Sequence, residues 1–154
     1  MILKSWKKVL ESDLLDVIKE MKSLISTPAV VILTGPVGAG KTTFSKYFVQ
    51  SMNIHSDAAS SEVLSPTYSI INEMDRFVHA DFFRIKQAHE ITHLEIPLYT
   101  DDKDYFFIEW GRPWINELIR IVDEDFNFYE IEFAINRSVD NEEIPSRNVI
   151  FYRV

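Results

Sequence analysis

A glycine-rich run near residue 40 has the residue types and spacing of a phosphate-binding loop. It follows the pattern Gly-x-x-x-x-Gly-Lys-Thr and consists of Gly35, Pro36, Val37, Gly38, Ala39, Gly40, Lys41 and Thr42. The glycines permit backbone angles that let successive amide N–H groups converge on an anion. Lys41 can reach the β- and γ-phosphates, the Thr42 hydroxyl is a hard oxygen ligand for Mg²⁺, and Thr43 can bond the α-phosphate. The run therefore predicts binding of a nucleoside triphosphate with magnesium.

Two carboxylates at predicted strand ends are candidates to complete this site. A phosphate loop needs an acid at the end of a neighbouring strand to orient Mg²⁺ or a water. Glu109 follows the unbroken apolar run 105–108, and Asp81 follows the less apolar run 77–80. The pattern favours a function for Glu109 and leaves Asp81 evenly balanced between a site residue and a solvated turn residue. His79 is expected to be structural, because no second histidine lies at ligand spacing on its strand.

Two further features accompany these candidates. Trp110 comes just past a strand end, so it is expected to be exposed; it either joins the core or covers the nucleotide or a partner. The segment Ser65, Pro66, Thr67 and Tyr68 is typical of a turn followed by a strand. Its hydroxyls could sense the γ-phosphate as a switch loop does, although the pattern alone favours a simple turn.

The elements around these residues predict one α/β domain over 1–154. The continuous apolar run 29–33 is typical of a strand buried on both faces, and the phosphate loop follows it directly. Helices are expected over about 13–25, 41–52, 87–95 and 113–120. Further strands are expected over 67–71, 76–82, 105–108, 126–135 and 149–154. This order indicates a mixed central sheet with an antiparallel pair at its C-terminal end.

Composition narrows the function classes. Asp and Glu outnumber Lys and Arg by 24 to 16, giving a net charge of -8, so direct binding to nucleic acid is not expected. The chain has no cysteine, which excludes disulfides, a thiolate nucleophile and cysteine-bound zinc. No apolar stretch approaches the ~20 residues of a membrane span, and the first residues lack the pattern of a signal peptide. A cytoplasmic protein is expected.

Several nucleotide-dependent functions fit these residues. No Asn/Thr-Lys-x-Asp element follows a late strand, so adenine is favoured over guanine. One alternative is a small-molecule kinase, which usually needs an arginine-rich lid. The arginines past Glu109 are instead scattered singly, at Arg112, Arg120, Arg137, Arg147 and Arg153. The other alternative is a non-hydrolysing nucleotide-sensing adaptor. Lys41, Thr42 and Glu109 argue against an inactive site, although all three could serve binding alone.

Four elements in one order resemble a known family. They are the phosphate loop with Thr43, the turn 65–68, the segment His79-Ala80-Asp81-Phe82-Phe83-Arg84, and Ile108-Glu109-Trp110. Together they resemble the TsaE (formerly YjeE) family, small bacterial ATPases needed for threonylcarbamoyladenosine modification of tRNA next to the anticodon. The resemblance spans about residues 30–110.

The resemblance implies a cytoplasmic protein with a P-loop NTPase-like three-layer fold that binds ATP or ADP and Mg²⁺. It also implies a slow ATPase that depends on the TsaD–TsaB heterodimer, with tRNA reached only through that complex and no membrane partner. Carried over by position, Lys41, Asp81 and Glu109 are catalytic, Lys41 and Thr43 contact the nucleotide, and Thr42 and Glu109 hold the metal. Residues 65–68 would form a switch-like loop, and Trp110 would lie at the site.

Overall fold

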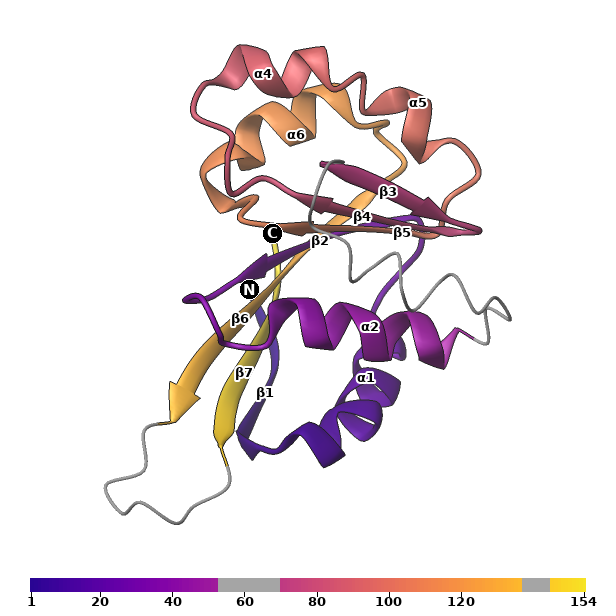
Figure 1. Cartoon of the computed structure of the whole chain (residues 1–154). Coiled ribbons are helices and arrows are strands. Elements are labelled where there is room, and N and C mark those ends of the chain that lie inside the picture. Colours follow the sequence, from indigo (N-terminus) through magenta and orange to yellow (C-terminus); the bar gives the residue numbers. More distant parts are fainter. Residues whose placement is uncertain (53–69, 137–144) are drawn as a thin grey trace.

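A seven-stranded mixed sheet forms the middle layer of the chain, and helices cover both of its faces (Figure 1). The structure is a computed structural model that describes residues 1–52, 70–136 and 145–154. The strand order is β1-β7-β6-β2-β5-β4-β3. The strands are β1 Ile2–Val9, β2 Ala29–Thr34, β3 Ile71–Met74, β4 Phe77–Asp81, β5 Tyr105–Glu109, β6 Asn127–Asn136 and β7 Ser146–Arg153.

The middle of the sheet is parallel and its borders are antiparallel. Strand β2 pairs in parallel with both β5 and β6, and β5 pairs in parallel with β4. Strands β3, β7 and β1 are added in antiparallel fashion, β3 beside β4 and β7 between β6 and β1. The predicted α/β fold with a mixed sheet and a C-terminal antiparallel pair is therefore confirmed, with the pair continuing the same sheet.

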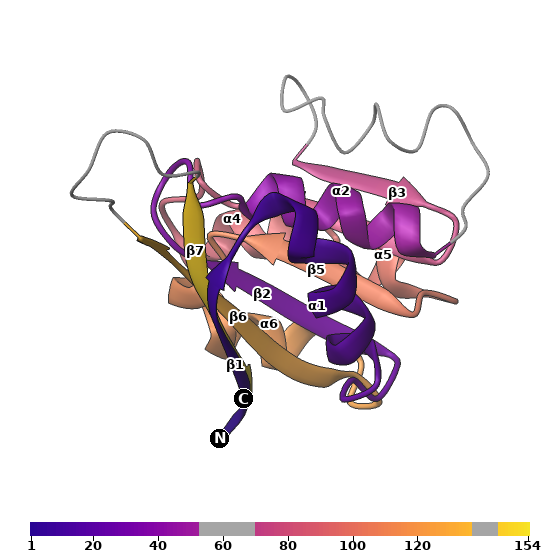
Figure 2. The same cartoon turned by 90° about the horizontal axis from the view of Figure 1, so that it is seen from below.

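Helices lie on the two faces of the sheet in separate groups. Helices α1 (Leu14–Lys22) and α2 (Lys41–Ser51) lie on one face, where Figure 2 shows them side by side. Helices α4 (Ala88–His93), α5 (Pro97–Thr100) and α6 (Ile115–Ile121) lie on the other face (Figure 1). Short 3₁₀ turns, η1 (Glu11–Asp13) and η2 (Arg112–Trp114), lead into α1 and α6.

The position of strand β2, with helices on both faces of the sheet, explains why its sequence is continuously apolar. Val31 and Leu33 pack into the core beneath α1 and α2, whereas Val30 and Ile32 pack into the core beneath α4 and α6. Successive strand residues point to opposite faces, so a strand covered on both faces needs an apolar residue at every position. All five residues from Ala29 to Leu33 are fully buried.

The structure differs from the predicted elements in a few places. The first helix ends at Lys22, and Ser23, Leu24 and Ile25 continue it only through bonds to carbonyls three residues earlier. Of the strand expected over 67–71, residues 67–69 lie outside the described residues, residue 70 is not in a strand, and Ile71 is the first residue of β3. Strand β1 and helix α5 were not predicted. Within the described residues no helix has the length and apolar character needed to cross a membrane.

Candidate functional site

The glycine-rich loop joins the carboxyl end of β2 to the start of α2, as the sequence predicted. Gly40 lies immediately before α2 with φ 95°, a left-handed conformation that side chains disfavour. At Gly35, a Cβ atom would lie 2.7 Å from the carbonyl oxygen of Phe133 on the neighbouring β6. The loop therefore requires glycine both for its backbone angles and for its close contact with the sheet.

The strand order brings the two predicted acids next to this loop, at the same end of the sheet. Asp81 and Glu109 are register partners at the carboxyl ends of the parallel strands β4 and β5, and Glu109 is also the partner of Leu33 on β2. After β2 the chain passes to β3, β4 and β5 on one side, and then to β6 and β7 on the other. Ligands bind at such switch points in open α/β sheets.

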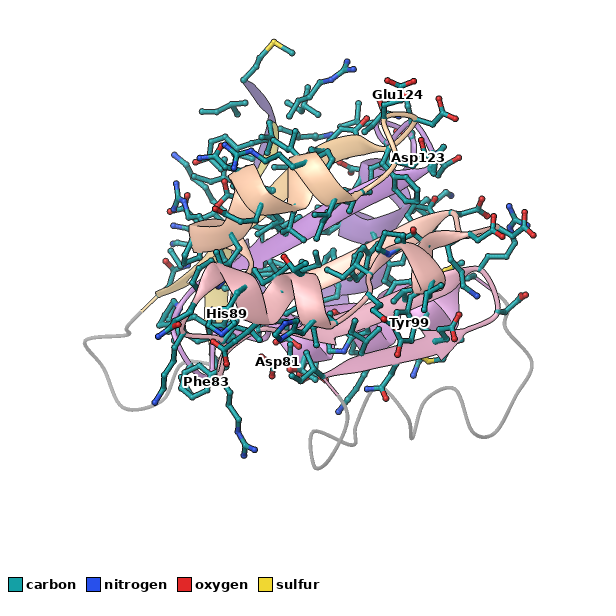
Figure 3. All side chains as sticks on the ribbon, turned by 90° about the horizontal axis from the view of Figure 1, so that it is seen from above. Asp81, Phe83, His89, Tyr99, Asp123 and Glu124 are labelled. Atoms are coloured by element: carbon teal, nitrogen blue, oxygen red, sulfur yellow. The ribbon has the colours of Figure 1, made fainter. Side chains whose placement is uncertain are left out.

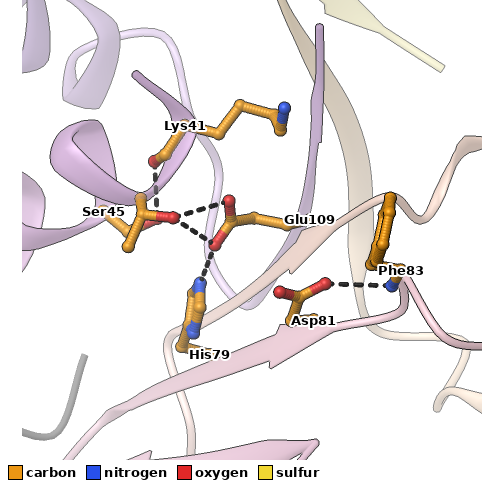
Figure 4. Close-up of polar contacts among 7 residues, drawn as sticks. Lys41, Ser45, His79, Asp81, Phe83 and Glu109 are labelled. Atoms are coloured by element: carbon orange, nitrogen blue, oxygen red, sulfur yellow. Dashed lines mark hydrogen bonds and ion pairs between the residues drawn. The ribbon is translucent and has the colours of Figure 1, made fainter. Parts of the chain in front are cut away.

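Glu109 is the centre of a buried hydrogen-bond cluster (Figure 4). Thr42 Oγ1 donates to the Glu109 carboxylate, with distances of 2.9 Å to Oε1 and 3.1 Å to Oε2. His79 Nε2 lies 2.7 Å from Glu109 Oε2. Glu109 and His79 are only 4% and 5% exposed. These contacts fix the direction in which the carboxylate faces and place it beside the Thr42 hydroxyl, the other predicted metal ligand.

His79 is the part of this cluster to which sequence reasoning gave no site role. It lies two residues before Asp81 on β4, and alternate residues of a strand point to the same face. The spacing of these two residues was therefore a signal that both side chains belong to one cluster. The His79 ring contacts the carboxylate of Glu109, the candidate metal ligand.

Asp81 lies beside Glu109 at the end of β4 (Figure 4). Its Oδ1 accepts a hydrogen bond of 2.9 Å from the backbone N–H of Phe83, which turns the chain directly after the strand. The other carboxylate oxygen has no such bond to a described residue. Asp81 is only partly buried and lines the groove next to the loop.

The side chain of Lys41 folds back onto the loop, where its ammonium group donates hydrogen bonds to two backbone carbonyls. Nζ donates to the carbonyl oxygens of Gly35 at 2.6 Å and Pro36 at 2.9 Å, and it lies 4.3 Å from the centre of the Trp110 ring. Burial lowers the pKa of Lys41, and the negative charges of Glu109 and Asp81 oppose that shift.

Trp110 is partly buried rather than exposed, so the sequence-based expectation of exposure was wrong. Its ring packs against the core on the α4 and α6 face and against the Phe83 ring, 5.2 Å away between centres. Its left-handed backbone, with φ 59°, turns the chain after β5 so that the ring lies over Lys41. Trp110 is thus a side wall of the site.

These residues surround a groove of about 290 Å³. Its lining consists of Val37, Gly38, Gly40, Lys41, Thr42, Thr43, Asp81, Glu109 and Trp110. The structure therefore brings together the predicted loop, both predicted acids and Trp110. The predicted switch-like segment, Ser65 to Tyr68, lies outside the described residues.

The oxygen donors of the groove suit a hard cation that also binds phosphate. Thr42 and Glu109 supply a hydroxyl and a carboxylate within hydrogen-bonding distance of each other. Among the described residues, no group of three or more His, Cys, Asp or Glu side chains forms a metal site by itself. Mg²⁺ usually takes one or two protein ligands together with water and substrate phosphates, so this donor set fits it.

A larger hollow of about 660 Å³ lies at the opposite end of the sheet, where the parallel strands begin. Its lining includes Asp101, Asp102, Asp104, Asp123 and Asp125. Figure 3 shows Asp123 and Glu124 far from Asp81. The lining also includes Arg76 and Lys103, but the carboxylates outnumber these two cations and repel phosphate, so this hollow does not compete with the loop as a nucleotide site.

The three-layer fold, with its phosphate loop at the switch point of the sheet, defines a P-loop protein. The crystal structure of Bacillus subtilis YdiB has the same fold, with a TM-score of 0.60 and 22% identity over 100% of this chain and 88% of that one. The family model described as threonylcarbamoyl adenosine biosynthesis protein TsaE matches residues 10–143. The chain belongs to the TsaE family, which confirms the resemblance drawn from the sequence.

Three curated relatives, among them proteins of Bacillus subtilis and Aquifex aeolicus, carry the name tRNA threonylcarbamoyladenosine biosynthesis protein TsaE. The Bacillus subtilis protein is 26% identical over 141 residues, which cover 89% of this chain and 80% of the relative. The Aquifex aeolicus protein is 32% identical over 79 residues, covering 49% of this chain. That match spans 57% of the Aquifex protein, so the similarity extends over little more than half of the relative's length.

Proposed function

We propose that this protein binds ATP with Mg²⁺ at the loop 35–42 and hydrolyses ATP in the synthesis of threonylcarbamoyladenosine on tRNA. In this proposal it acts with the TsaD–TsaB heterodimer and reaches tRNA only through that complex. Family membership supports a role in this pathway, because the description of the family names threonylcarbamoyl adenosine biosynthesis. The acidic net charge of -8 fits a component whose partner holds the nucleic acid.

One observation carries the nucleotide part of the proposal. The Thr42 hydroxyl at the start of α2 donates to the carboxylate of Glu109, which comes from a strand end 67 residues later. This pairing of a loop hydroxyl with a strand-end acid is the arrangement that holds Mg²⁺ against phosphates in P-loop NTPases. The same groove contains Lys41 and the converging backbone of the loop.

Each residue has a task that follows from its position. The loop amides and the N-terminus of α2 bind the phosphates, since both present partial positive charge to an anion. Lys41 exchanges the Gly35 and Pro36 carbonyls for the β- and γ-phosphates, and Thr42 and Glu109 hold Mg²⁺. Bound Mg²⁺ supplies neutralisation of the charge that develops on the transferring phosphoryl group. Asp81, with one carboxylate oxygen that no described residue bonds, orients the attacking water.

Binding and turnover need separate measurements. For binding, we expect ATP with Mg²⁺ to raise the melting temperature more than GTP does, because preferential binding to the folded state stabilises it. For turnover, we expect ATP hydrolysis to be slow alone and faster with the TsaD–TsaB heterodimer. An absence of stabilisation by either nucleotide would contradict the loop assignment.

The site assignment is tested by removing the charge of Glu109. Glu109→Gln keeps the side-chain size, and we expect partner-stimulated hydrolysis to fall by at least about 100-fold, as for loss of a group that stabilises transition-state charge. Glu124→Gln, an equal change at an exposed position near the opposite end of the sheet, is the control. Unchanged turnover in Glu109→Gln would show that the assignment is wrong.

A further inference from the structure

Arg147 reaches the phosphate loop from the C-terminal strand of the sheet. Strand β7 runs antiparallel to β6, so its first residues lie at the edge where β6 ends, and Arg147 is the register partner of Ile135. A Cβ atom on Gly40 would overlap Arg147 Nη1 and lie 3.2 Å from Cζ. The guanidinium therefore lies directly against Gly40, one of the glycines that line the groove.

Two sources of positive charge come from the chain next to Gly40, against which this guanidinium lies. Gly40 precedes the first turn of α2, where an 11-residue helix presents the positive end of its dipole, and Lys41 follows at once. The arginine side chain carries a positive charge. Two cations and a helix N-terminus repel one another unless an anion lies between them.

The backbone of Arg147 pairs with the neighbouring strands, but its guanidinium makes no hydrogen bond or ion pair with another residue in the described part of the chain. Other arginines of the same region have oxygen partners: Arg112 Nε lies 3.3 Å from Glu130 Oε1, and Arg153 Nη2 lies 3.5 Å from Asn127 Oδ1. Arg147 is nonetheless partly buried. Among the described residues, therefore, no acceptor occupies the donors of this partly buried guanidinium, and they can bind a ligand.

We infer that Arg147 is a nucleotide-contact residue whose guanidinium binds phosphate oxygens of the nucleotide held by the loop. This inference rests on the proposed function and adds a residue to its site. The planar fork of donors matches two phosphate oxygens at once, which a lysine ammonium cannot do. Arg147 contacts the nucleotide from the β6 and β7 side, while Asp81 and Glu109 approach from the β4 and β5 side of β2.

The binding of ATP and ADP with Mg²⁺ to the full chain tests this inference. We expect Arg147→Gln to weaken the affinity for both nucleotides by about 10-fold or more, since a hydrogen bond between charged groups is lost. Arg153→Gln is the matched control, because it removes the same charge from the same strand at its far end. We expect its nucleotide affinity to equal that of the wild type.

The outcomes separate this inference from the proposed function. If the wild type itself does not bind ATP, the proposed function fails. If the wild type binds ATP and Arg147→Gln binds it as tightly as Arg153→Gln does, the role of Arg147 is overturned while the loop assignment stands. The melting temperature of each variant, measured without nucleotide, shows whether that variant is folded. Arg147→Met, which keeps an aliphatic stem against the strand, is the second variant; undiminished ATP affinity in either folded variant overturns the inference.

Discussion

His79 Nε2 and Glu109 Oε2 lie 2.7 Å apart at the centre of the site, and both side chains are buried. An ionised carboxylate can only accept hydrogen bonds, so in that state the proton between them belongs to His79 Nε2. The contact then fixes the orientation of Glu109 together with the hydrogen bond from Thr42. His79 is in this way a positioning residue for the candidate metal ligand.

Loss of this contact should weaken the response to magnesium. We expect His79→Ala to raise the Mg²⁺ concentration needed for half-maximal ATP binding by about 10-fold or more, as for other groups that orient a metal ligand. Titration of Mg²⁺ at fixed ATP measures this change. His79→Gln, whose amide can still donate to Glu109, should recover part of the loss. Equal Mg²⁺ requirements in wild type and His79→Ala would contradict the role.

The phosphate loop offers a matched pair of glycine substitutions. Gly38 and Gly40 both have left-handed backbones, with φ of 80° and 95°. A Cβ atom at Gly38 meets open space, whereas one at Gly40 overlaps the Arg147 guanidinium. We expect each change to alanine to cost about 1 kcal/mol of folding free energy through backbone strain.

Their effects on nucleotide binding should differ. Gly40→Ala should lower ATP affinity more than Gly38→Ala, because its methyl group fills space between the loop and Arg147. Chemical denaturation and ATP titration of the two variants separate strain from obstruction. Equal affinities would mean that the Gly40 side of the loop does not face the nucleotide.

An aromatic cluster holds α2 against the sheet behind the loop. The Phe48 ring centre lies 4.5 Å from that of Phe107, 4.8 Å from that of Tyr105 and 6.0 Å from that of Phe77. Phe48→Ala should lower the free energy of unfolding by about 3–5 kcal/mol, because it removes a fully buried ring and leaves a cavity. Phe83→Ala, at a ring that is 63% exposed, should cost far less. Urea denaturation compares them.

The end of the sheet opposite the site should contribute to acid sensitivity. Arg76 binds both carboxylate oxygens of Asp104 at 2.6 and 2.7 Å, and this contact lowers the pKa of Asp104 below its ordinary value. Since the folded-state pKa is depressed, the stabilisation is present above the unfolded-state pKa and is lost as the pH falls through the folded-state pKa.

Asp104→Asn should remove this contribution. We expect its melting temperature to fall by about 1–3 °C at pH 7, the range for an exposed ion pair, and the difference from wild type to shrink below pH 4. The exposed Asp101→Asn is the control, and it should follow the wild type at both pH values. A constant difference at all pH values would assign the effect to something other than the charge of Asp104.

The sequence predicted those parts of the fold and site that a short segment determines by itself. The continuous run 29–33, the loop after it and the acid after 105–108 each follow from strand burial and phosphate chemistry. Strand β1 was missed because an edge strand with three lysines has no clear apolar alternation. Trp110 was misjudged because its burial depends on a positive φ and on distant elements.

His79 and Arg147 show why the remaining site residues were harder to find. His79 takes its role from a carboxylate 30 residues later, and its spacing to Asp81 was the one local hint. Arg147 lies more than 100 residues after the loop, on a strand whose direction brings it back to Gly40. Contacts of this kind follow from strand order, which no single segment of sequence contains.

The pairing of β1 with β7 has a consequence for how the chain matures on the ribosome. In the described sheet β1 has β7 as its neighbour, and residues 2–9 therefore wait for residues 146–153 before their backbone groups can pair. The phosphate loop emerges long before β7 does. If Arg147 contributes to binding as inferred, a nascent chain that already contains the complete loop gains full affinity for ATP only when its last described strand has been synthesised.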